Sequence, residues 1–229
     1  MFKYFLPYDV FERHKKVGSL INKNQSVLDI GGELNHLSQF CQAKKIIIAN
    51  LTSGDVIIPK GKLPFTKNSF VVVCSIDVLE HIPKKKRQEF VASLVRIASN
   101  KVILSFPVGT RKHIKYEKLV QIILKKKGKS VKYLNEHIHY GLPSQKEIRN
   151  MFRSYKTEIS YSGNIKINEL LFKLFIFDPK IKFVRRIIFF SKLVFNLFTN
   201  QLLYIILSNK TYSVSINRAF VIINKQQWK

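Results

Sequence analysis

Long apolar runs alternate with segments of helical periodicity through the first half of the chain. Apolar runs at 26–30, 45–51, 70–76 and 101–107 are typical of strands covered on both faces of a parallel sheet. A segment that begins at Pro83 repeats its apolar residues at helical spacing, and proline suits the first turn of a helix. Strand and helix therefore alternate, which predicts an α/β fold with a doubly wound, mostly parallel sheet.

The same patterns predict the remaining elements within one domain, residues 1–229. Apolar residues at helical spacing predict helices over 10–21, 34–43, 116–128 and, behind a capping box at Ser144–Glu147, 144–152. Strands are predicted over 155–161 and 219–223. Ligands of such sheets bind beyond the carboxyl ends of the strands, which here are residues 29–33, 50–55, 75–81 and 106–113.

The connection after the second strand is too short for a helical crossover. Only a handful of residues separate the strand ending near Asn50 from the apolar segment 56–58, and a parallel crossover needs about a dozen. We therefore expect no helix there, and we expect residues 56–58 to form an edge segment instead of a conventional parallel strand.

An insert of different character, residues 164–210, precedes the last strand. It is dense in Phe, Leu and Ile, and Asp178-Pro179 divides it into two helices. In the second helix, basic and apolar residues gather on opposite sides at 100° per residue: Lys182, Arg185, Arg186 and Lys192 against Val184, Ile187, Ile188, Val194, Phe195 and Phe198. This pattern is typical of an interfacial helix on an anionic membrane; a helical lid or a dimer interface is the alternative.

A membrane span fits the insert less well. Residues 187–207 are long enough to cross a bilayer, but Lys192, Asn196, Asn200 and Gln201 lie inside that stretch. The strands that flank the insert are also expected to be neighbours in one sheet, so both ends must return to the same side. Aromatic and lysine side chains could bind RNA instead, but arginine is sparse and no RNA-binding motif occurs.

Charge and cysteine content limit the possible partners and the cellular compartment only partly. The chain has 40 basic and 14 acidic residues and a formal charge of +26, which favours anionic partners; a general bias toward Lys, Ile, Asn and Phe is the other explanation. Cys41 and Cys74 are isolated in apolar segments, as expected in a reducing compartment. The first residues show no signal-peptide pattern, so we expect a cytoplasmic protein, peripheral on the inner face of the membrane if the insert binds lipid.

Motifs in the first half identify a family resemblance. The stretches "VLDIGGELNHLSQF" and "LPFTKNSFVVVCSIDVLEHIPKKKRQEFVASLVRIASNKVILSFP" occur in order at characteristic separations. With a weaker continuation through "NEHIHYGLPS" and "NRAFVIINK", the chain resembles class I S-adenosylmethionine-dependent methyltransferases, particularly the small methyltransferase-11-like branch. The resemblance implies a seven-stranded Rossmann-like sheet, S-adenosylmethionine as cofactor and methyl transfer as the reaction.

The resemblance also implies a cofactor site after the first two strands. Asp29 matches the carboxylate that holds the methionine end of the cofactor, and Gly31 and Gly32 match the turn that lets the backbone approach closely. Asn50 stands where an acidic residue usually binds the ribose, and Ser75 at the end of a central strand is a further candidate.

Departures from the family pattern put cofactor binding in question. Glu33 and Asn35 stand where further glycines are common. Asn50 can bind a ribose hydroxyl, but without the strength of a charge-assisted hydrogen bond. A non-catalytic methyltransferase-fold scaffold is therefore one alternative, and an RNA-binding methyltransferase is another.

The catalytic candidates follow the fourth strand. His81 lies where the methyl group of the cofactor is expected to point and is the candidate general base, while Asp77 could face either cofactor or substrate. In an extended "EHIHY" segment, His137 and His139 would share one side, and His113 and Glu136 are expected over the same sheet edge. With no third clustered ligand, the sequence predicts no metal site.

The acceptor is the least determined part of the prediction. The insert favours an acceptor that is membrane-associated or anionic, such as a lipid-linked or cell-surface glycan precursor. A quinone-like or isoprenoid molecule is the next hypothesis. The acceptor atom and the oligomeric state stay open, with a homodimer through the insert among the alternatives.

Overall fold

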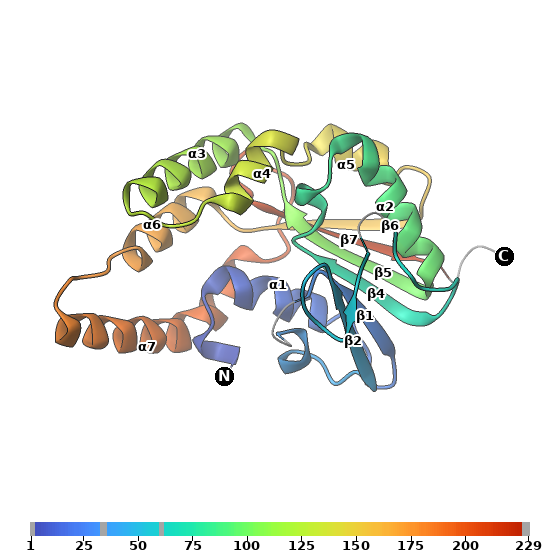
Figure 1. The fold of residues 1–229 in the computed structure, drawn as a ribbon, viewed down its shortest axis with the longest axis horizontal. Helices are drawn as coiled ribbons and strands as arrows, with labels where there is room; N and C mark the ends of the chain where they lie inside the picture. The colour runs from blue at the N-terminus through green and yellow to red at the C-terminus, as the bar shows by residue number, and fades with distance from the viewer. Residues whose placement is uncertain (1–2, 33–35, 60–61, 226–229) are drawn as a thin grey trace.

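A computed structural model describes residues 3–32, 36–59 and 62–225 of the chain. The elements form one sheet with helices on both faces and a helical extension at one side (Figure 1). In chain order they are η1 (Lys3–Phe5), α1 (Tyr8–Gly18), β1 (Ser26–Ile30), η2 (Leu37–Gln39), β2 (Lys45–Asn50), β3 (Val56–Ile57), β4 (Phe70–Ile76), η3 (Leu79–His81), α2 (Lys84–Ile97), β5 (Ala98–Pro107), α3 (Arg111–Lys126), α4 (Lys132–Tyr140), α5 (Gln145–Phe152), β6 (Thr157–Ser162), α6 (Ile165–Phe175), α7 (Lys182–Leu207) and β7 (Arg218–Asn224).

The sheet has seven strands in the order β3-β2-β1-β4-β5-β7-β6. β7 runs antiparallel to both of its neighbours, and the other strand pairs are parallel. This arrangement confirms the predicted doubly wound, mostly parallel Rossmann-like sheet with a helical insert before the last strand. Because β6 and β7 pair directly, the two ends of the insert lie side by side, as expected.

The alternating side chains of the central strands divide the core into two layers. Val73 faces the layer formed with α2 and α5, where Leu94 and Phe152 are fully or almost fully buried. Val72 and Cys74 face the opposite layer, which is closed by α1 and η2. Both faces of the strands are therefore covered, which explains why they read as continuous apolar runs.

The connection between β2 and β3 contains no helix at any of its residues, 51–55, as expected. The backbone N–H of Ile48 donates to the Asp55 carboxylate at 2.8 Å, and Gly54 takes a φ of 100°. These features carry the chain back along β2 in a short loop. The segment lies at the sheet edge, as expected, but the expectation that it is no parallel strand is wrong, because β3 pairs parallel with β2 over two residues.

The helix predicted over 34–43 is wrong where the structure describes this segment. Residues 37–39 form a single 3-10 turn, η2, and residues 40–43 continue without a helix. Phe40 packs its ring on Phe11 at a centroid distance of 5.5 Å. A Cβ at Gly18 would lie 2.7 Å from the Phe40 carbonyl oxygen, so the backbone after η2 rests directly on the end of α1. Tertiary packing thus replaced the local helical pattern.

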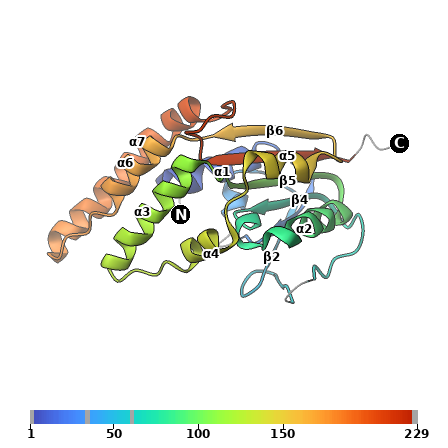
Figure 2. The same ribbon diagram turned by 90° about the horizontal axis from the view of Figure 1, so that it is seen from above.

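Helices α6 and α7 extend away from the sheet on the side that also carries α3 (Figures 1 and 2). A small apolar cluster joins α3, α4 and α6, with Val120, Leu124 and Leu134 buried and Phe172 packed against them. The C-terminal half of α7 packs on α1 and η1, where the rings of Phe11 and Tyr204 meet edge to face. The insert is thereby anchored at both ends, and its α6–α7 elbow projects outward.

The polar residues inside α7 bind the protein itself. Asn196 donates to the carbonyl of Phe5, and Asn200 donates to the carbonyls of Tyr4 and Leu6 at 3.0 and 2.9 Å. Nearer the elbow, Lys192 of α7 donates to the carbonyls of Phe175 and Phe177. Nearer the end of α7, Gln201 accepts from Lys15 of α1. α7 therefore turns these four polar residues toward the protein, while much of its apolar surface is exposed.

Candidate active site

A cavity of about 720 Å³ opens beyond the carboxyl ends of β1, β4 and β5. Its floor includes the turn after β1 and the turn after β4, and α1 contributes Asp9, Arg13 and His14. The far wall comes from α3, α4 and α6, with Asn168 and Phe172 from the insert. The cavity thus lies where doubly wound sheets bind their ligands.

The carboxyl end of β1 presents a buried carboxylate next to a glycine turn. Asp29 is 3% exposed, and its Oδ1 has no hydrogen-bond partner among the described residues. Burial raises the pKa of Asp29 to about 7. Its other oxygen lies 2.3 Å from where a Gly32 Cβ would stand, and Gly31 has a φ of 83° with Val78 pressed against it. Glycine is required at both positions for the turn to face the cavity.

The remaining predicted cofactor residues are placed differently. The Asn50 amide donates to the Gly32 carbonyl at 3.2 Å and to the Gly31 carbonyl at 3.4 Å, so this side chain braces the turn from outside the cavity lining. Ser75 is buried within β4, also outside the lining. The predicted departures at Glu33 and Asn35 lie outside the described residues.

Asp77 lies at the end of β4 in a two-arginine ion pair. Arg218 on β7 binds both of its carboxylate oxygens, the second at 3.3 Å, and Arg13 on α1 contacts it at 3.1 Å. Burial alone would raise the pKa of Asp77, but Arg13 and Arg218 hold it well below its usual range. A carboxylate so strongly stabilised in its charged form is a poor proton acceptor. Asp77 instead ties three elements together, with its own φ of 54° in the left-handed region.

His81 is oriented by a carboxylate from α4. Its Nδ1 lies 2.7 Å from a Glu136 oxygen, which leaves Nε2 for another partner. Burial and the neighbouring His137 lower the pKa of His81, against the opposing effect of Glu136. The ring is therefore neutral at neutral pH and able to accept a proton or a metal ion.

The structure corrects the expected His137 and His139 pair. The segment is helix α4, not extended chain, so residues two apart point to different sides. His137 is buried beside His81, with ring centroids 4.9 Å apart, whereas His139 is exposed. His137 Nδ1 binds Glu117 on α3 at 2.8 Å.

Sequence reasoning missed the two arginines and Glu117. Arg218 stands 141 positions from Asp77, and no local pattern links the two residues. The only sequence signal was an arginine at the head of an otherwise apolar last strand, where an uncompensated charge would be costly. Glu117 looked like one position of an amphipathic helix, although it is 7% exposed.

Comparisons with known proteins agree with this architecture. No protein-family model matches the sequence, and no curated protein matches it. Among solved structures, a methyltransferase from Archaeoglobus fulgidus aligns over 97% of this chain and 96% of its own, with a TM-score of 0.52 and 10% identity. The fold is that of the S-adenosylmethionine-dependent methyltransferases.

Two other structures with this methyltransferase fold carry bound ligands. Haemonchus contortus phosphoethanolamine N-methyltransferase 2, in complex with S-adenosyl-L-methionine, aligns over 93% of this chain at a TM-score of 0.51 and 15% identity. This chain spans about half of that enzyme, 51%. Geranyl diphosphate C-methyltransferase from Streptomyces coelicolor, in complex with S-adenosyl-L-homocysteine, aligns over 93% of this chain and 79% of its own. The TM-score is 0.52 and the identity is 7%.

Proposed function

We propose that this protein is an S-adenosylmethionine-dependent methyltransferase that acts at an anionic membrane surface. The observation that carries the cofactor assignment is the buried Asp29 carboxylate beside the Gly31-Gly32 turn, whose Oδ1 has no hydrogen-bond partner among the described residues. A buried charge needs a partner, and the ammonium and sulfonium groups of the cofactor supply positive charge beside it. The cavity volume is also within the range of small-molecule sites, about 300 to 1,000 Å³.

His81 is the proposed general base. The cofactor, when bound, supplies an electrophilic methyl group, so the protein has to align the acceptor and remove its proton. Glu136 holds the His81 ring through Nδ1, and the lowered pKa keeps Nε2 free to accept that proton at neutral pH. The paired Asp77 takes a positioning role, because it holds the turn between β4 and η3 against Arg13 and Arg218.

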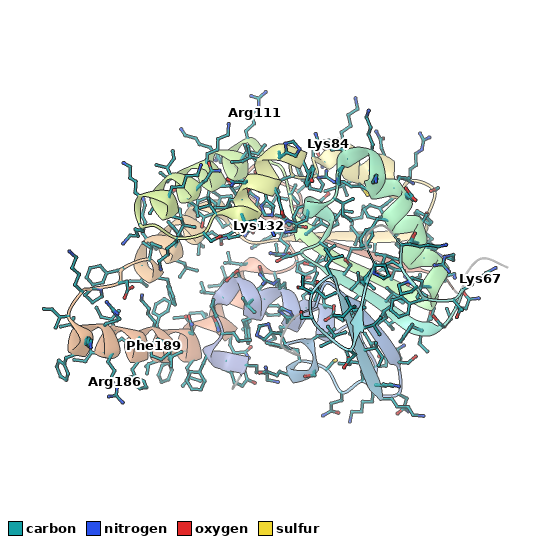
Figure 3. The ribbon with its side chains drawn as sticks, in the orientation of Figure 1. Lys67, Lys84, Arg111, Lys132, Arg186 and Phe189 are labelled. Atoms are coloured by element: carbon teal, nitrogen blue, oxygen red, sulfur yellow. The ribbon has the colours of Figure 1, made fainter. Side chains whose placement is uncertain are left out.

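The α6–α7 insert supports the membrane assignment. Large apolar side chains on its outer surface are more than half exposed, and they run along the whole of α7 and its approach: Leu170, Phe177, Ile181, Phe183, Phe189, Phe190, Phe198, Leu202 and Ile205. An unpartnered apolar surface of this kind marks a protein or membrane contact. Basic residues flank it at the elbow, where Arg186 points away from the body (Figure 3), and anionic lipid headgroups complement them.

An in-plane hairpin suits the insert better than a span. Among the described residues, α7 is the one helix with the length and apolarity to cross a bilayer. The two ends of the insert, however, are tied to β6 and β7, which are adjacent strands of one sheet, and the inward side of α7 binds the carbonyls of residues 4–6 through Asn196 and Asn200. We propose that α6 and α7 lie in the interface plane, which places the protein peripherally on the cytoplasmic face of the membrane.

The insert also connects the membrane surface to the cavity. Asn168, Leu171, Phe172 and Phe175 of α6 line the cavity, while Leu170 and Leu174 on the same helix face outward. An acceptor with an apolar anchor could thus stay in the membrane while its head group reaches the site.

A lipid-linked or cell-surface glycan precursor is the acceptor that we propose, with an isoprenoid-type molecule as the second candidate. Placement in the small methyltransferase-11-like branch is part of the same proposal and rests on the motifs from Val27 to Pro107.

Two binding measurements test this function. Isothermal titration with S-adenosylmethionine and S-adenosylhomocysteine should show one site, and the absence of binding to both would favour a non-catalytic scaffold. Vesicle co-sedimentation should increase with the fraction of anionic lipid and fall with salt. Tight, steeply salt-dependent RNA binding without vesicle binding would support the RNA-binding alternative.

Variants of α7 separate the membrane surface from its alternatives. Charge reversal of Arg185 and Arg186 should weaken binding to anionic vesicles roughly tenfold or more, since each basic residue near such a surface contributes about 1 kcal/mol. Phe183→Ser with Phe198→Ser should weaken binding to every vesicle composition. Leu51→Ser, which alters a residue that is 60% exposed outside the insert, is the matched control. A stable dimer by light scattering that the Phe variants dissociate, with wild-type vesicle binding retained, would assign α7 to a subunit interface.

A further inference from the structure

Three metal-ligating side chains converge at the wall of the cavity. Glu80 and His81 belong to η3 and His137 belongs to α4, and one ligand atom from each lies within 4.8 Å of the other two. All three residues line the cavity. The topology therefore builds a compact cluster from two segments that are about 55 residues apart in sequence.

Each histidine of the cluster is held by its own carboxylate. Glu136 contacts His81 Nδ1 at 2.7 Å, and Glu117 contacts His137 Nδ1 at 2.8 Å. These contacts fix both ring orientations and leave Nε2 of each ring for a further partner. Carboxylates placed behind histidines in this way are typical of metal centres, where they orient the ligand and raise its basicity.

Two atoms of the cluster have no partner within the described part of the chain. His137 is 8% exposed and Glu80 is 1% exposed, and both His137 Nε2 and Glu80 Oε2 lack a hydrogen bond. Buried polar atoms in native proteins are nearly always satisfied. Arg218 lies near Glu80 and lowers its pKa, against the larger effect of burial, but the bonds that Arg218 makes through its terminal nitrogens go to Asp77 and Ser105 and not to Glu80.

We propose that Glu80, His81 and His137 bind a divalent transition-metal ion, with Glu117 and Glu136 as positioning residues. Two imidazoles and one carboxylate suit Zn²⁺, Fe²⁺ or Mn²⁺ and leave coordination positions open. The open side faces the cavity, so the cation would bind an oxygen of the methyl acceptor. This role rests on the proposed function, but the metal site itself does not. In the metal-loaded form, His81 is a ligand and no longer the free base.

The site is tested with Zn²⁺ on purified full-length protein after dialysis against a chelator. Titration calorimetry should show one Zn²⁺ per chain, and Co²⁺ in place of Zn²⁺ should give the visible absorption of a bound ion with nitrogen ligands. His137→Ala and Glu80→Gln should abolish this binding. His139→Ala is the matched control, since it removes an exposed histidine from the same helix and should leave the affinity unchanged.

The positioning residues provide a graded second test. Glu117→Gln keeps the side-chain shape but loses the charge behind His137, and it should weaken Zn²⁺ binding about 10- to 100-fold. Circular dichroism checks that each variant is folded, and His137→Gln replaces His137→Ala if the smaller side chain unfolds the protein. Zn²⁺ binding that all of these variants retain, or no Zn²⁺ binding by the wild type, would overturn the proposal.

Cofactor titration keeps this outcome separate from that of the proposed function. S-Adenosylmethionine binding without Zn²⁺ binding removes the metal site and leaves the methyltransferase proposal intact. Zn²⁺ binding without cofactor binding supports the metal site and contradicts the methyltransferase proposal. In the first case the cluster would be a proton-sharing network in which a protonated Glu80 donates to the His137 ring.

Discussion

Replacement of Asp29 by Asn should stabilise the fold at alkaline pH while it weakens cofactor binding. The carboxylate is buried, one of its oxygens has no partner in the described part of the chain, and burial raises its pKa from 3.8 to about 7. A shift of about three units corresponds to about 4 kcal/mol, at about 1.4 kcal/mol per unit. Asn has nearly the same shape and no charge, so the variant lacks this pH-dependent term.

The direction of this pH dependence follows from the raised pKa of Asp29. A carboxyl group whose pKa is higher in the folded state favours folding at low pH, and that contribution is lost as pH rises from about 4 through about 7. From about pH 5.5 up to the folded-state pKa of about 7, the pH rises by roughly 1.5 units. At about pH 8.5 the wild type should therefore have lost about 2 kcal/mol of its free energy of unfolding relative to the variant.

Urea unfolding at the two pH values measures this difference. Asp178→Asn is the control for the loss of one carboxylate charge elsewhere in the chain, because the Asp178 side chain is 49% exposed. Titration calorimetry on the same Asp29→Asn protein should show cofactor affinity reduced at least about tenfold, a loss of about 1.4 kcal/mol or more. A variant that binds the cofactor like wild type, or that is destabilised equally at both pH values, would refute the reasoning.

Three further substitutions test the contacts around the site and the insert. Arg218→Met leaves Asp77 with one arginine and should lower the free energy of unfolding by about 3 kcal/mol or more in urea; an unchanged midpoint would contradict the ion pair. Gly32→Ala places a Cβ 2.3 Å from an Asp29 oxygen and should weaken cofactor binding by calorimetry about tenfold or more, whereas wild-type affinity would show that the turn does not carry the cofactor. Asn200→Leu leaves two N-terminal carbonyls without their donor and should cost about 1 to 3 kcal/mol, seen as a lower melting temperature; no change would mean that this end of α7 is not docked.

Local patterns predicted the sheet and most of its helices. The strand runs of the first half became β1, β2, β4 and β5, and the short connection after Asn50 correctly excluded a helix. The capping box at Ser144 formed as expected, with both of its hydrogen bonds present. These features depend on neighbouring residues or on loop length, and both can be read along the chain.

The failures arose where tertiary packing outweighed a local pattern. Residues 37–43 carried helical spacing, yet their backbone rests on Gly18 and their side chains fill the layer beside α1. The reverse occurred at His137 and His139, where a segment considered as extended chain became α4. Short patterns are compatible with more than one structure, and long-range contacts decide between them.

For the candidate site, the sequence alone placed Asp29, Gly31 and Gly32 together, because they are close neighbours along the chain at the end of β1. It also determined that the insert is apolar and basic. Only the tertiary structure decided that Asp77 forms an ion pair with Arg218 and that His81 contacts His137, since the sheet order brings distant segments to one edge. The same holds for α7, whose Asn196 and Asn200 turn inward because residues 4–6 present carbonyl groups there. Its exposed apolar surface follows from that docking.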